Sequence, residues 1–183
     1  MERNELEVTK TIDFLKLDKR IRYGVYAIGL CLLLFVLNLD DIYRIPQLLY
    51  PLSLLQLIVV VPVVVLHELA HGLAFKTFGK KIKFGFKLQK VINVIFYTTS
   101  PGSILPRKEM IFVALAPQIM TIAILSILFL LKDTVLKNCL LTFAAFNLAS
   151  GCADIYMAWL IARQKGNIFV EDTGTGAIIY KKA

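Results

Sequence analysis

Four long apolar runs divide this chain and restrict what it can fold into. They cover residues 23–39, 51–75, 111–131 and 135–162. A helix needs about 20 mainly apolar residues to cross the hydrocarbon core of a bilayer, and an isolated strand or loop cannot cross it. The runs therefore predict an all-α integral membrane protein with four transmembrane helices. They form a single domain spanning residues 1–183.

The distribution of charge supports a membrane partner. The chain is 57% apolar and 19% charged, whereas a soluble domain carries about 25% charged residues. Its net charge is +8, but the lysines and arginines lie between the apolar runs, where they suit anionic lipid headgroups. The expected partner is therefore the lipid bilayer, and no nucleic acid is expected.

Basic residues also predict an orientation. They concentrate in the N-terminal segment 1–22, the loop 76–110 and the tail 164–183, whereas the linker around Asp40 and Asp41 has few. Cytoplasmic loops carry the excess of lysine and arginine. We therefore expect both termini and the loop 76–110 to be cytoplasmic.

The loop between the second and third runs carries a strand pattern. Apolar residues at 82, 84, 86 and 88 alternate with residues 81, 83, 85 and 87, and residues 91–97 can form a second strand. The pattern predicts a small cytoplasmic β-hairpin or sheet between helices 2 and 3. The tail has a turn at residues 173–176 and could pair with this sheet.

The second run contains the motif H-E-x-x-H, formed by His67, Glu68 and His71. Residues four apart on a helix point in nearly the same direction, about 6 Å apart along the axis. The two imidazoles can therefore share one metal ion, with Glu68 beside them as a base. They are the only two histidines in the chain. The alternative is a polar patch that packs helices together.

A hydrolytic zinc site usually has three protein ligands, so a third is needed. Asp154 is the acidic residue whose expected depth in the membrane matches that of the two histidines. The other acidic residues after the motif are expected at different depths. Asp133 is expected on the opposite side of the membrane, and Glu109, Glu171 and Asp172 are expected in the cytoplasmic region. The sequence therefore predicts a Zn²⁺ site formed by His67, His71 and Asp154.

The fourth run also carries a polar stripe. Asn147, Ser150 and Asp154 recur at helical spacing, and the small Gly151 allows another helix to approach closely. The stripe is expected to face the second helix, where Asn147 and Ser150 could contact substrate or a developing oxyanion. The alternative is that both only form hydrogen bonds between helices. Pro117, in the third run, leaves a backbone carbonyl that neighbours must satisfy.

These residues resemble those of a known group of proteins. The H-E-L-A-H-G segment, together with Asn147-x-x-Ser150-Gly151-x-x-Asp154, is similar to the bacterial membrane family described as putative zincin peptidases and, more distantly, to site-2 intramembrane metalloproteases. The resemblance implies His67, His71 and Asp154 as zinc ligands and Glu68 as general base. It also implies a bacterial plasma membrane, and alignment of substrate by addition to a strand such as residues 82–88.

The sequence thus predicts a zinc-dependent, membrane-embedded endopeptidase acting on peptide bonds of membrane or membrane-proximal substrates. Two alternatives remain open. One is a membrane protein that binds or transports metal without proteolysis, and the other is an inactive scaffold with a protease-like fold. The oligomeric state is not predicted.

Overall fold

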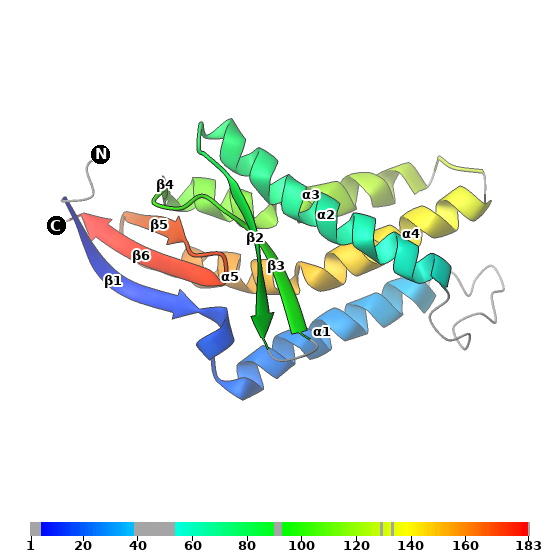
Figure 1. Cartoon of the computed structure of the whole chain (residues 1–183), viewed down its shortest axis with the longest axis horizontal. Coiled ribbons are helices and arrows are strands. Elements are labelled where there is room, and N and C mark those ends of the chain that lie inside the picture. Colours follow the sequence, from blue (N-terminus) through cyan, green and yellow to red (C-terminus); the bar gives the residue numbers. More distant parts are fainter. Residues whose placement is uncertain (1–4, 39–53, 90–92, 129, 133, 183) are drawn as a thin grey trace.

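The computed structural model describes residues 5–38, 54–89, 93–128, 130–132 and 134–182. Figure 1 shows how the helices and strands are arranged. In chain order they are β1 (Leu6–Asp13), the 3-10 helix η2 (Phe14–Lys16), α1 (Lys19–Asn38), α2 (Leu54–Thr77), β2 (Lys83–Gln89), β3 (Asn93–Thr99), β4 (Ile104–Pro106), α3 (Arg107–Leu128), α4 (Thr134–Ser150), α5 (Cys152–Ala162), β5 (Ile168–Asp172) and β6 (Gly176–Lys182).

The prediction of an all-α protein with four transmembrane helices is wrong. The described residues form five α-helices and six strands in two sheets. Among them, α3 is the one helix that is long and apolar enough by itself to cross a membrane. Helices α4 and α5 reach that length only together, and they are bent by 43° at their junction. The fourth run failed as a single span because hydropathy measures how apolar a run is, not whether its helix continues unbroken. The all-α prediction failed because the segments before and after the helices form strands that pair with each other.

The N-terminal segment and the tail form a four-stranded antiparallel sheet in the order β1-β6-β5-β4. Leu6 pairs with Lys182 and Asp13 with Gly176, so the two ends of the described chain lie side by side (Figure 1). Buried apolar residues of this sheet pack against Phe75 of α2, Met110 of α3 and Ile161 of α5. The tail therefore pairs with β1 and β4, not with the loop strands as expected.

The hairpin expected in the loop is present as β2 and β3, paired antiparallel from Lys83–Thr99 to Gln89–Asn93. It lies against α2 at Gly72, where an added Cβ would touch Phe84 and Thr98. The Thr98 hydroxyl donates a hydrogen bond to the backbone carbonyl of Glu68 at 2.9 Å. The hairpin is thus fixed to the turn of α2 that carries the H-E-x-x-H motif.

Candidate metal centre

Helix α2 presents its two histidines to the protein interior. His67 and His71 are 6% and 9% exposed, and their ring centroids are 5.1 Å apart. Val65 and Leu73 on the same helix are more than half exposed. This arrangement follows from the four-residue spacing, which keeps both imidazoles on the inward side of the helix.

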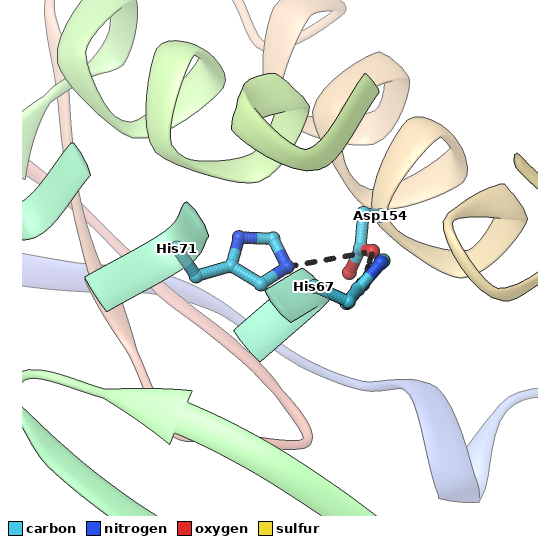
Figure 2. A group of neighbouring side chains, drawn as sticks. All are labelled: His67, His71 and Asp154. Carbon is cyan, nitrogen blue, oxygen red and sulfur yellow. Dashed lines mark hydrogen bonds and ion pairs between the residues drawn. The ribbon is translucent and has the colours of Figure 1, made fainter. Parts of the chain in front are cut away.

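Asp154 reaches the histidines from the first turn of α5. Its Oδ2 lies 3.1 Å from Nε2 of His67 and 3.5 Å from Nε2 of His71, and Figure 2 shows the three side chains converging. The bend after α4 precedes Asp154, so α5 begins in a new direction. One ligand atom from each residue lies within 4.8 Å of the others.

The spacing of these atoms suits a zinc ion. A tetrahedral ion with bonds of about 2.0–2.1 Å holds its ligand atoms about 3.4 Å apart. The two measured separations, 3.1 and 3.5 Å, bracket that value. Glu68 follows His67 in sequence, and in the described part of the chain its buried Oε2 has no hydrogen-bond partner. The donor set and the neighbouring carboxylate therefore fit a hydrolytic zinc site.

The second nitrogen of each ring contacts an oxygen atom. Nδ1 of His71 lies 2.8 Å from the backbone carbonyl of Val113, and Nδ1 of His67 lies 3.0 Å from Oδ1 of Asn147. A carbonyl oxygen can only accept a hydrogen bond, so each Nδ1 carries the proton. Each Nε2 then presents its lone pair toward Asp154, which is the form that binds a metal.

Asn147 and Ser150 lie beside His67, as the polar stripe predicted. Asn147 is completely buried, and its Nδ2 donates to the Pro117 carbonyl at 2.8 Å and to the Thr121 hydroxyl at 2.6 Å. The Ser150 hydroxyl donates to the Asn147 carbonyl at 3.0 Å and lies 3.3 Å from Nδ1 of His67. Contact of Asn147 or Ser150 with an oxyanion stays a prediction.

A cavity of about 480 Å³ opens onto the three ligand residues. Helices α2, α3 and α5, strand β3 and the β5–β6 turn form most of its wall, and η2, α1 and the end of α4 contribute the remaining residues. Asp172 at the end of β5 also lines it, although the sequence argument assigned that residue to a separate cytoplasmic region. Burial raises the pKa of Asp172 to about 6. The packing of the four-stranded sheet on α2, α3 and α5, which no local pattern reveals, brings this carboxylate to the cavity.

Comparison with known families identifies the group to which this arrangement belongs. A family model described as "Putative zincin peptidase" matches residues 58–169, which is more than half of the chain and includes every ligand residue. The chain belongs to this zincin peptidase family. No curated protein and no solved structure matches it. Membership of the zincin peptidase family points to metallopeptidase activity and to zinc as the metal.

Proposed function

We propose that this protein is a zinc-dependent, membrane-embedded endopeptidase that hydrolyses peptide bonds in membrane or membrane-proximal substrates. One observation carries the proposal. Asp154 Oδ2 lies 3.1 and 3.5 Å from the two Nε2 atoms of the H-E-x-x-H histidines. Membership of the zincin peptidase family supports the same chemistry.

His67, His71 and Asp154 would hold the metal through two nitrogen atoms and one oxygen atom. Zinc bound there would supply a Lewis acid that makes water more acidic and polarises a substrate carbonyl. Glu68 accepts a proton from the attacking water and later passes it to the leaving amine. The buried, unpartnered Oε2 of Glu68 suits this role, because no other described group competes for it.

The substrate backbone would lie in the cavity beside β3. Phe96, Tyr97 and Thr98 of this strand line the cavity, next to the turn of α2 that carries the motif. The second sheet has two described strands, β2 and β3, so the outer edge of β3 has no described strand beside it. An extended peptide segment could add to that edge, with its backbone hydrogen bonds holding the scissile bond near Glu68.

The outer surface of the helices supports contact with lipid. Val61, Val65 and Leu73 of α2 are each more than half exposed, as are Ile119 and Ile122 of α3. Large exposed apolar patches are rare on soluble monomers and mark an interface or a membrane contact. We propose that these surfaces contact the acyl chains of a bacterial plasma membrane. The basic termini would then be cytoplasmic.

Metal analysis of two site variants tests the function. Wild type purified in detergent should hold one zinc per chain, His67→Ala should lose it, and Glu68→Gln should keep it. Cleavage of a panel of membrane-segment peptides in liposomes should be lost in both variants. Leu69→Ala is the matched control, because this partly exposed leucine lies on the same helix outside the ligand set. Zinc in the wild type without cleavage of any peptide would instead favour a metal-binding protein or a scaffold.

A further inference from the structure

We propose that Pro117 is a positioning residue that fixes the orientation and tautomer of His71, and that the backbone carbonyl at the same position holds Asn147, which does the same for His67. The inference rests on the proposed zinc centre but not on peptidase activity. Pro117 is fully buried in the middle of α3. It is not among the residues that line the cavity, and it acts through two backbone carbonyl groups.

The first carbonyl is that of Val113. In an α-helix the carbonyl of residue 113 accepts a hydrogen bond from the backbone N–H of residue 117. Proline has no N–H, so this carbonyl has no helical donor. Nδ1 of His71 takes that position and lies 2.8 Å from the Val113 oxygen. The proline thereby provides a fixed, buried acceptor that His71 can reach only when its Nδ1 carries the proton.

The second carbonyl is that of Pro117 itself. It accepts hydrogen bonds from Nδ2 of Asn147 at 2.8 Å and from the Thr121 hydroxyl at 3.3 Å. The Thr121 oxygen in turn accepts from Nδ2 of Asn147 at 2.6 Å.

These contacts determine which way the Asn147 amide points. Its NH₂ group faces two acceptors, so Oδ1 must be the atom that faces His67, at 3.0 Å from Nδ1. His67 is therefore also held with its proton on Nδ1 and with the Nε2 lone pair free. The proline thus determines the tautomer of His71 through the Val113 carbonyl that it leaves without a helical donor. The tautomer of His67 is set by Asn147, which the backbone carbonyl of residue 117 and the Thr121 hydroxyl hold in place.

Replacing the proline tests this directly. Pro117→Ala restores an N–H that competes with His71 for the Val113 carbonyl. The metal-free variant should keep its far-UV circular dichroism and its thermal unfolding transition, because alanine suits a helix better than proline does. Its zinc affinity, measured by competition with a chromophoric chelator, should fall about 10–100-fold, the usual effect of losing a group that orients a metal ligand.

Pro62→Ala in α2 is the matched control. It is also a proline inside a helix, but its side chain is exposed and no described contact links it to the histidines. Zinc affinity should therefore stay at the wild-type value. A Pro117→Ala protein that folds and binds zinc as tightly as the wild type would overturn the inference while leaving the proposed function intact.

Nitrogen NMR of the imidazoles gives a second readout that does not require metal. The chain has two histidines, so ¹⁵N-labelled protein gives one pair of ring signals for each. With both rings neutral, the wild type should show protonated Nδ1 on both. Pro117→Ala should shift the His71 signals away from this tautomer, and Asn147→Leu should shift those of His67 alone. Unchanged signals in both variants would contradict the proposal, even if one variant bound zinc poorly for another reason.

Discussion

At the scale of single residues, the carboxylates near the metal centre have different environments. Asp154 is held between two imidazoles, whereas Asp172 lines the same cavity without joining the ligand cluster. Asp172 accepts a hydrogen bond from the Gly174 backbone N–H at 3.0 Å. Burial nevertheless dominates and raises its pKa to about 6.

This raised pKa predicts how stability depends on pH. An aspartate in an unfolded chain has a pKa of about 3.9, so between about pH 4 and pH 6 the folded protein binds more protons at Asp172 than the unfolded chain does. The contribution of Asp172 to stability is therefore present below that window and is lost as the pH rises through about 6. Asp172→Asn removes this dependence while keeping an oxygen that can accept from Gly174.

Calorimetry of the metal-free protein can measure the effect. The Tm of Asp172→Asn minus that of the wild type should increase from pH 4 to pH 7. Asp13→Asn is a control, because that aspartate caps η2 and does not line the cavity. A constant Tm difference across the interval would show that burial does not raise the pKa of Asp172.

The sequence predicted the ligand residues but not what orients them. Spacing on a helix identified His67 and His71, and matching of depth selected Asp154. The structure brings these three together. Pro117 marks the Val113 carbonyl in the sequence as one without a helical donor, but only tertiary packing shows that His71 meets it.

At the scale of elements, the junction of α4 and α5 directs Asp154 toward the histidines. A Cβ added to Gly151 would overlap the side-chain amide of Gln118, which is itself buried on α3. Gly151 therefore lets α3 approach the bend closely. Hydropathy could not locate this bend, because small and apolar residues continue on both sides of it.

Gly151→Ala should destabilise the protein by about 1–3 kcal/mol, the usual cost of overpacking a core. It should also weaken zinc binding, because α3 and α5 carry or orient ligands on both sides of the contact. Gly24→Ala in α1 is the matched control, since no atom lies within 4 Å of its added Cβ. That variant should gain up to about 1 kcal/mol from better helix propensity. Denaturant unfolding would measure the change in stability, and competition with a chelator would measure the change in zinc affinity. If Gly151→Ala and Gly24→Ala had the same stability and zinc affinity, the bend would have no role in either.

The sequence predicted the β2–β3 hairpin but not strand β1, and the difference has a physical reason. The β2–β3 hairpin is local and alternates clearly, so its pattern was visible in the sequence. Strand β1 mixes charged and apolar residues and pairs with β6 at the other end of the chain. Its strand conformation depends on that distant partner, which a local pattern cannot identify.

At the scale of the whole molecule, the β1–β6 pairing requires that residues 6 and 182 lie on the same side of any membrane. Reporter fusions at the two termini should therefore behave alike in bacterial cells. With cytoplasmic termini, both should fluoresce as green fluorescent protein fusions, and both should be inactive as alkaline phosphatase fusions. Opposite results at the two ends would contradict the sheet, and phosphatase activity at both would contradict the proposed orientation.

The same pairing has a consequence for biosynthesis. Strand β1 leaves the ribosome before all five α-helices of the described chain, and its partner β6 follows all of them. The four-stranded sheet cannot close until β6 has been translated, and contacts between such distant segments form slowly. Because this sheet packs on α2, α3 and α5, the packing around the candidate metal centre would be completed only after β6 has emerged. A nascent chain that stops before β6 would therefore lack the sheet that packs behind the candidate zinc ligands, and it should bind zinc more weakly than the full chain.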